Sequence, residues 1–234
     1  MKLRQAGLVD PEFARQYYES ATQGHWWLAG RVKLIAGLAA RAGLTEGLAV
    51  DLGAGTVSLF PKAFDVVKLD WVVPHGVAGP FVRASVTRLP FERDTFDAVG
   101  LFDVLEHMDD ATLSLDEARR VLKRGGALFY TVPAFPMLWS KHDDLVGHVR
   151  RYRPTEVTNL VEGCGFRSLW SSMYYGFLLA PALLRKVVNR GSSFALPSQA
   201  VNRLLTRTAE RSVSFALGPG RRLGLSIGGV AVRL

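Results

Sequence analysis

The most restrictive pattern in the chain is the segment at residues 49–56, AVDLGAGT. Its first four residues are apolar except for Asp51, which is the pattern of a buried strand. Gly53 and Gly55 follow at once, and glycine permits a tight backbone turn and a close approach of a ligand. Asp51 therefore lies near the carboxyl end of a strand, which is where open α/β sheets bind their ligands.

The rest of the chain alternates between strand and helix patterns, which predicts an α/β fold with a mainly parallel sheet and helices on its faces. Gly125 and Gly126 are expected to end the helix that precedes them, and loops are expected at 191–193 and 218–220. Strands are expected at 48–52, 65–70, 81–84, 96–103, 127–133, 166–173 and 223–234, and helices at 11–22, 31–42, 113–123, 154–163, 176–190 and 198–213.

Composition favours a single large globular domain, because 48% of the 234 residues are hydrophobic and 21% are charged. Cys164 is the only cysteine, so an internal disulfide is excluded and a cytoplasmic location is expected. The start of the chain has no apolar signal core, and the nearly uncharged run at 168–184 is short for a membrane span. One cysteine and five scattered histidines predict no metal site.

Basic residues are concentrated at the end of the chain. Residues 185–234 hold nine of the 29 Lys and Arg residues but only one acidic residue, Glu210. Such a segment attracts phosphate groups, on a small acceptor or on an anionic membrane surface, which predicts either a phosphate-bearing ligand or peripheral membrane contact. A solvated arginine face on a core-packing helix pair is the plainer alternative. Nucleic acid is not expected, because aromatic residues do not alternate with the basic ones.

Several short motifs follow the glycine turn in a fixed order: a strand that ends in Asp70, then TRLPF at 87–91, FDAV at 96–99, DVLEH at 103–107 and RVLKRGG at 120–126. Over residues 25–170 this series resembles the class I S-adenosylmethionine-dependent methyltransferases. The resemblance implies a Rossmann-like, three-layer sandwich with a mainly parallel seven-stranded sheet and an antiparallel last strand. HWWLAGR at 25–31 and HDDLVGHVRRY at 142–152 further resemble a bacterial subgroup that modifies sugars, glycolipids or secondary metabolites.

The sequence departs from the family pattern at three places. Val57 stands where the family has a third glycine, and Asp51 and Asp70 are so close in sequence that the helix after the first strand is expected to be shortened by about a turn. The Pro- and Gly-rich segment 71–81 replaces the second helix. Ser85 stands where the family commonly has an aspartate, and its hydroxyl can still accept a hydrogen bond from adenine.

The resemblance implies S-adenosylmethionine as the cofactor and assigns residues to it. Asp70 would accept both ribose hydroxyls, as in dinucleotide sites. Trp71 would cover the adenine, although it fits equally well as a core or loop aromatic. Asp103 would order the methionine end. The full cofactor set is Asp51, Gly53, Gly55, Asp70, Trp71, Ser85, Val86 and Asp103.

Three histidines are the candidate catalytic bases: His107 after the fourth strand, and His142 and His148 in the polar loop after the fifth. Two alternatives stay open. In one, His107 only bonds the backbone at a helix start; in the other, the loop is a salt-bridged lid. If the loop binds the acceptor, its arginines act as anion clamps. The candidate acceptor residues are Trp27, Arg31, Asp143, Arg150, Arg151 and Tyr152.

The domain organisation follows from these assignments: an N-terminal helical cap at 1–46, a methyltransferase-like core at 47–175, and a basic helical insertion with a closing strand at 176–234. The predicted function is methyl transfer from S-adenosylmethionine to a hydroxyl of a sugar, nucleoside or lipid-linked glycan in a biosynthetic pathway. Two other functions stay open. One is non-methyl chemistry on the same scaffold, and the other is a catalytically inactive, methyltransferase-like partner protein.

Overall fold

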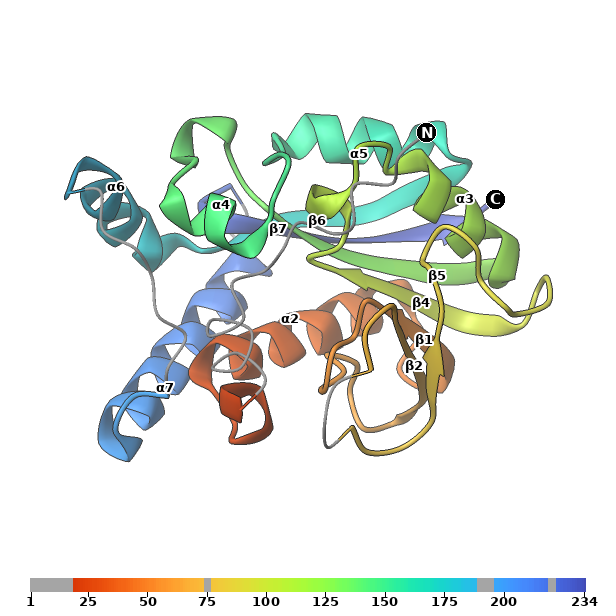
Figure 1. The fold of residues 1–234 in the computed structure, drawn as a ribbon, viewed down its shortest axis with the longest axis horizontal. Helices are drawn as coiled ribbons and strands as arrows, with labels where there is room; N and C mark the ends of the chain where they lie inside the picture. Colours follow the sequence, from red (N-terminus) through yellow and green to blue (C-terminus); the bar gives the residue numbers. More distant parts are fainter. Residues whose placement is uncertain (1–18, 74–76, 189–195, 219–221) are drawn as a thin grey trace.

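A computed structural model describes residues 19–73, 77–188, 196–218 and 222–234 as a three-layer α/β sandwich (Figure 1). The central layer is one seven-stranded sheet with the strand order β3-β2-β1-β4-β5-β7-β6. β7 pairs antiparallel with both β5 and β6, while the other neighbours pair in parallel. The predicted mainly parallel sheet with a reversed last strand is therefore confirmed.

The strands lie close to the predicted ranges. Pairing places Asp51 beside Lys68 and Gly100, so β1 lies between β2 and β4 at the centre of the parallel part. The bounds are β1 Gly47–Leu52, β2 Phe64–Asp70, β3 Phe81–Arg83, β4 Phe96–Phe102, β5 Leu122–Pro133, β6 Phe166–Tyr175 and β7 Gly224–Arg233.

The helices cover both faces of the sheet, with α3 and α5 on one side and α2 and α7 on the other (Figure 1). Three short 3-10 helices, η1 to η3, lie in the connections. The bounds are α2 Trp26–Ala42, η1 Leu105–His107, α3 Thr112–Val121, η2 Pro136–Leu138, α4 Lys141–Val146, α5 Pro154–Gly163, η3 Gly176–Leu178, α6 Leu179–Val188 and α7 Gln199–Ala216.

Alternation along the strands divides the buried side chains into two cores. In β4, Val99 and Leu101 face the core under α3 and α5, whereas Ala98 and Phe102 face the core under α2 and α7. Successive residues of a strand point to opposite faces, so a strand that is apolar throughout must be covered on both sides. This is why the continuous apolar runs in the sequence required helices on both faces.

The expectation of a shortened helix after the first strand is wrong. Residues 53–63 contain turns and no helix. Buried polar groups hold this loop in place of helix packing. Asp51 accepts hydrogen bonds from the Ser58 hydroxyl at 2.6 Å and from the Leu59 amide at 3.3 Å, and the ammonium of Lys68 donates to the carbonyls of Thr56 and Ala78.

The helix α3 ends earlier than expected. Its last residue is Val121, and residues 122–126 already belong to β5, where Leu122 pairs with Phe96. Gly125 and Gly126 therefore lie within the strand and do not end the helix. The sheet pairing of Leu122 ends the helix instead, which a local glycine signal does not reveal.

The predicted elements at the two ends of the chain are only partly described. Of the helix expected at 11–22, residues 19–22 are helical and the rest lies outside the described residues. Of the helix expected at 176–190, residues 176–188 form η3 followed by α6, and residues 189–190 and the loop expected at 191–193 lie outside the described residues. Within the described ranges, no helix is long and apolar enough to cross a membrane.

The strand β7 depends on a glycine at its start. A Cβ atom on Gly224 would lie 2.2 Å from both the nitrogen and the oxygen of Tyr174, which are backbone atoms that cannot move aside. We expect Gly224→Ala to lower the free energy of unfolding by about 1–3 kcal/mol, the usual cost of overpacking. Gly163→Ala, at the end of α5 with open space around it, should be neutral or stabilising. Denaturant unfolding of both variants checks this, and equal effects would contradict it.

Candidate cofactor and acceptor site

The glycine turn after β1 folds back onto the end of β2. The amides of Gly53 and Ala54 donate to the Leu69 carbonyl at 2.7 and 3.2 Å, and the Gly55 amide donates to Asp70 Oδ2 at 3.0 Å. Gly53 has a φ of +74°, and a Cβ there would meet Val104 at 2.7 Å. Glycine is thus required at this position both by its backbone conformation and by packing. The turn places Asp70 beside Gly55.

Asp70 is half-buried and keeps accepting capacity. Its Oδ1 accepts from the Val72 amide at 3.2 Å, so each carboxylate oxygen takes one backbone hydrogen bond and retains a further lone pair. Trp71 beside it is 60% exposed, with the Arg83 guanidinium 5.9 Å from its ring centroid. A half-exposed carboxylate next to an exposed indole can hold a ribose diol beside an adenine ring.

The two residues assigned to the adenine amine lie just after β3. Ser85 Oγ is 2.9 Å from the hydroxyl of Thr87 and accepts from the Thr87 amide at 3.2 Å. Ser85 and Val86 are both half-buried. The Ser85 hydroxyl therefore already stabilises a local turn, and its role toward adenine stays a prediction.

Asp51 is fully buried at the end of β1, and its Oδ1 accepts no hydrogen bond from the described residues. Burial raises the pKa of this carboxyl to about 7, although the hydrogen bonds from Ser58 and Leu59 oppose the shift. A buried carboxyl oxygen without a partner at the glycine turn is suited to a cationic or hydrogen-bond-donating group of a ligand.

Arg31 and Asp103 form a buried ion pair at the carboxyl ends of β4 and β5. Arg31 is 2% exposed, and its guanidinium lies 2.8 Å from Asp103 Oδ2 and 2.6 Å from the Thr131 hydroxyl, which in turn donates to Asp103 Oδ1 at 2.8 Å. Asp103 has a φ of +56°. Arg31, predicted to contact the acceptor, thus orients Asp103, and a direct acceptor contact stays a prediction.

These residues fit S-adenosylmethionine. Asp70 and Trp71 match the nucleoside part, and Asp51, the glycine turn and Asp103 match the charged methionine part. The unpartnered Asp51 oxygen and the free lone pairs of Asp70 are the observations that carry this fit.

The three predicted histidines come together at the same edge of the sheet. The ring centroids of His107 and His148 are 4.9 Å apart, and those of His142 and His148 are 6.3 Å apart. His107 Nδ1 lies 3.1 Å from the Gly147 carbonyl, and Val149 donates its amide to the Glu106 carbonyl at 2.8 Å. These two contacts hold the segment 147–149 against η1. Burial lowers the pKa of His107 to about 4, so the ring is neutral at neutral pH.

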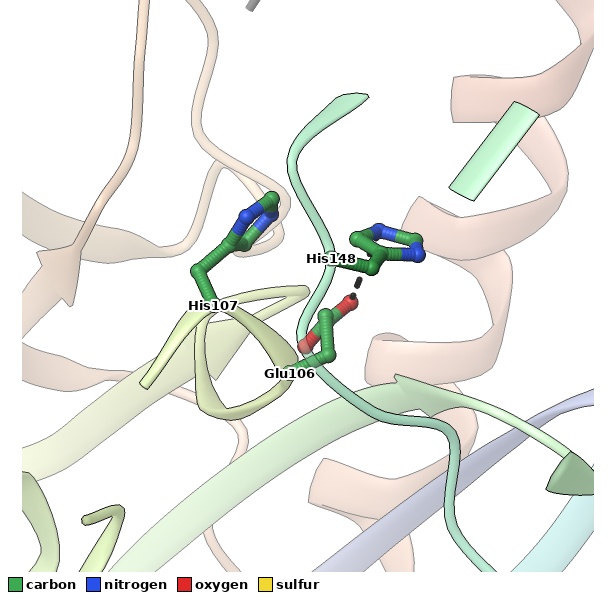
Figure 2. Close-up of side chains that lie close together, drawn as sticks. All are labelled: Glu106, His107 and His148. Atoms are coloured by element: carbon green, nitrogen blue, oxygen red, sulfur yellow. Dashed lines mark ion pairs between the residues drawn. The ribbon is translucent and has the colours of Figure 1, made fainter. Parts of the chain in front are cut away.

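Glu106 is the site residue that sequence reasoning missed. It is fully buried in η1, and neither carboxylate oxygen accepts a hydrogen bond from another described residue. Burial, reinforced by the nearby Asp103, raises its pKa well above the ordinary value. Its Oε1 lies 3.8 Å from His148 Nε2 (Figure 2). The one signal in the sequence was its position directly before His107. The contact of Glu106 with His148 arises only from the fold.

The polar loop after β5 is built around Asp143. This buried carboxylate accepts from Arg151 Nε at 2.7 Å, from His148 Nδ1 at 2.8 Å and from the Ser140 amide at 2.8 Å. Burial opposes its ionisation, but the hydrogen bonds from His148 and Arg151 outweigh burial and lower its pKa. Asp143 thereby fixes the orientation of His148.

The other predicted acceptor residues mostly contact the protein itself. Arg151 donates to the Ala134 carbonyl at 3.0 Å, Tyr152 donates its hydroxyl to the Leu105 carbonyl at 3.0 Å, and Arg150 donates to the Asp109 carbonyl at 2.8 Å. Trp27 packs on Tyr175 with ring centroids 4.7 Å apart. The salt-bridged-lid alternative describes Arg151 well. Arg150 remains exposed, and contacts of these residues with an acceptor stay predictions.

Comparison with known proteins supports the class that the fold and site define. Residues 29–130 match the family described as a methyltransferase domain. A demethylmenaquinone methyltransferase of Clavibacter sepedonicus is 32% identical over 109 residues, which are 41% of this chain and 44% of that protein. The chain thus matches less than half the length of this curated relative.

Solved structures share the fold over nearly the whole chain. One is an S-adenosylmethionine-dependent methyltransferase of Thermotoga maritima, described as a possible histamine N-methyltransferase, with a TM-score of 0.60, 18% identity and coverage of 95% of this chain and 98% of that one. Another is the 1,6-didemethyltoxoflavin-N1-methyltransferase of Burkholderia thailandensis with bound S-adenosylhomocysteine, with a TM-score of 0.57, 17% identity and coverage of 98% and 92%.

The protein therefore has the fold of the class I S-adenosylmethionine-dependent methyltransferases, and residues 29–130 match their domain family. These findings support S-adenosylmethionine as the cofactor. The sequence-based prediction of the fold class is confirmed.

The buried Asp51 predicts a pH dependence of stability. Because its pKa is about 7 in the folded state, against 3.8 for an unperturbed carboxyl, the folded state holds this proton more tightly. The resulting stabilisation is present below the unperturbed pKa and is lost as the pH rises through about 7. We expect the ligand-free protein to lose stability relative to Asp51→Asn between about pH 5 and pH 8. Thermal unfolding at both pH values, with the exposed Asp65→Asn as control, measures this, and parallel pH profiles would contradict it.

Proposed function

We propose that the protein transfers a methyl group from S-adenosylmethionine to a hydroxyl of a small polar acceptor, such as a sugar, a nucleoside or a lipid-linked glycan. The observation that carries the proposal is the adjacency of two groups of residues at one sheet edge. Asp51, Asp70 and Asp103 lie at the ends of β1, β2 and β4. His107 is four residues after Asp103, and the rings of His148 and His142 follow within 4.9 and 6.3 Å, centroid to centroid, along the series His107, His148, His142.

The residues have separate roles in this proposal. Asp70 holds the ribose, and Asp51 with the glycine turn holds the methionine part. The cofactor supplies an electrophilic methyl group on a sulfonium. Positioning of donor and acceptor in line supplies much of the rate in such a reaction. His107 and His148 orient the acceptor hydroxyl, and Arg151 with Asp143 holds the loop that carries His148.

Proteins with this fold carry names of different acceptors and reactions, so the fold alone does not select the acceptor. Two of the methyltransferases named above act, by their names, on demethylmenaquinone and on 1,6-didemethyltoxoflavin. A structure with a TM-score of 0.52 and 18% identity is described as a [4+2]-cyclase. Non-methyl chemistry is therefore the second candidate. Release of S-adenosylhomocysteine with hydroxylated acceptors supports methyl transfer, and turnover of an acceptor without that release favours the second candidate.

The ribose assignment predicts that Asp70→Ala weakens binding of S-adenosylmethionine and S-adenosylhomocysteine by about 1–3 kcal/mol, since a charged hydrogen-bond partner is lost. Calorimetric titration of both compounds measures the effect. Asp65→Ala is the matched control, because Asp65 lies exposed on the same strand β2. Unchanged affinity in Asp70→Ala would remove the ribose assignment, and no binding to the unaltered protein would remove the cofactor.

We also propose peripheral contact of the C-terminal helices with an anionic membrane surface. On α7, Arg203, Arg207 and Arg211 are exposed beside the exposed apolar side chains of Leu204 and Phe215. A groove of about 480 Å³ between α7 and residues 176–179 is lined by Phe177, Leu179, Arg211, Phe215 and Leu223. Basic and apolar side chains on one face are typical of helices that lie on lipid headgroups.

Binding to vesicles tests this contact. Each basic side chain near an anionic surface contributes about 1 kcal/mol, so replacing Arg203, Arg207 and Arg211 by serine is expected to weaken binding to phosphatidylserine vesicles by up to about 3 kcal/mol. Serine at Lys62, Arg93 and Arg124, which are exposed on other segments, removes the same charge and should have less effect. Co-sedimentation measures both, and equal losses would contradict a specific face.

A further inference from the structure

Glu106, His107 and His148 form a compact cluster that the cofactor assignment does not use. Each side chain offers one ligand atom, and these atoms all lie within 4.8 Å of one another. Figure 2 shows the Glu106 carboxylate directed toward the His148 ring, with His107 on the same short helix η1. Glu106 and His107 follow Asp103 by three and four residues, and hydrogen bonds between η1 and the segment 147–149 bring His148 beside them.

Each of the two imidazole rings is held by a hydrogen bond from its own Nδ1 atom. His107 Nδ1 is 3.1 Å from the Gly147 carbonyl, and His148 Nδ1 is 2.8 Å from Asp143 Oδ1. Carbonyl and carboxylate oxygens only accept, so Nδ1 carries a proton in each ring, and in the neutral tautomer Nε2 is the nitrogen that offers a lone pair to a cation. This arrangement is typical of metal-binding histidines, whose second nitrogen donates to a carbonyl or a carboxylate.

Glu106 is a second, independent observation. The side chain is 0% exposed, and neither oxygen accepts a hydrogen bond from another described residue. The two other acidic side chains nearby, Asp103 and Asp143, each have an arginine partner, whereas Glu106 has no arginine within ion-pair distance among the described residues. Its Oε1 is 3.8 Å from His148 Nε2, which is beyond hydrogen-bond distance. Burying a carboxylate that accepts no hydrogen bond is costly, and a bound cation would remove that cost.

We propose that Glu106, His107 and His148 bind a divalent first-row transition-metal cation. Two imidazole nitrogens and one carboxylate oxygen are a donor set that catalytic zinc sites use, with an open position for water or substrate. Metal–ligand bonds of about 2.0–2.2 Å place the ligand atoms about 3.3 Å apart, so small side-chain rotations complete the site.

The chemical consequence rests on the proposed function. A hydroxyl oxygen bound at the open position has a lowered pKa and is held facing the cofactor methyl group. Its proton leaves to solvent, and an oxygen electron pair forms the bond to the methyl carbon. The carbon–sulfur bond breaks with its electron pair on sulfur, so the sulfonium becomes a thioether. More than one open position would favour acceptors with two adjacent hydroxyls, which chelate the cation.

Metal titration of the full chain tests the site without measuring activity. After removal of metal with a chelator, we expect the protein to bind one Zn²⁺ by calorimetry and one Co²⁺ by visible absorption. Glu106→Gln and His148→Gln should each weaken binding about tenfold or more, as for altered metal-site residues. Asp109→Asn is the matched control, because it neutralises an exposed carboxylate three residues after Glu106. Thermal unfolding of each variant verifies that it is folded.

The outcomes separate this site from the proposed function. Absence of Co²⁺ and Zn²⁺ binding, or unchanged binding in Glu106→Gln and His148→Gln, overturns the metal site. Methyl transfer that resists the chelator and Glu106→Gln overturns the role of the cation in the reaction, while the proposed function stands. Asp70→Ala should retain metal binding with weakened cofactor binding. Metal binding in a protein that binds no S-adenosylmethionine overturns the proposed function and supports the site.

Discussion

The geometry of the candidate site rests on the buried ion pair between Arg31 and Asp103. The guanidinium of Arg31 is almost fully removed from water. Its buried charge is tolerated because Asp103 and Thr131 accept its hydrogen bonds. The pair joins α2 to the ends of β4 and β5 and holds Asp103 in a left-handed backbone conformation. Asp51 and Asp70, which are proposed to bind the cofactor, precede Asp103 in the chain, and η1 with His107 follows it.

Hydrogen bonds from buried polar side chains also fix the loops after β1 and β5, which contain little regular secondary structure. Asp51 fixes the loop after β1 through Ser58, and Lys68 joins that loop to the segment before β3. In the loop after β5, Asp143 accepts hydrogen bonds from Ser140, His148 and Arg151. The polar backbone groups of a buried loop need hydrogen-bond partners. Polar side chains at fixed positions, such as Asp51, Lys68 and Asp143, supply those partners in these loops.

The match to the methyltransferase domain covers residues 29–130 and ends within β5. Asp51, Asp70, Asp103 and Glu106 lie inside it, whereas His142, His148 and the Asp143 network lie beyond it. The residues proposed to bind the cofactor thus lie in the part of the chain that matches the domain family. The residues proposed to bind the acceptor lie mostly in the following loop, and loops at the carboxyl edge of a sheet carry the specificity of many enzymes.

Local patterns in the chain were sufficient to predict a mainly parallel sheet with helices on its faces, because strand and helix periodicity are local signals, whereas the reversed last strand followed from the resemblance to a known family. They failed at residues 53–63 and at the end of α3, where sheet pairing and buried polar contacts override local propensity. Folding alone brings Glu106 beside His148, 42 positions later in the chain, and makes Arg151 a buried partner of Asp143. The first of these contacts depends on hydrogen bonds between η1 and the segment 147–149, and a sequence pattern does not encode the distance between segments so far apart.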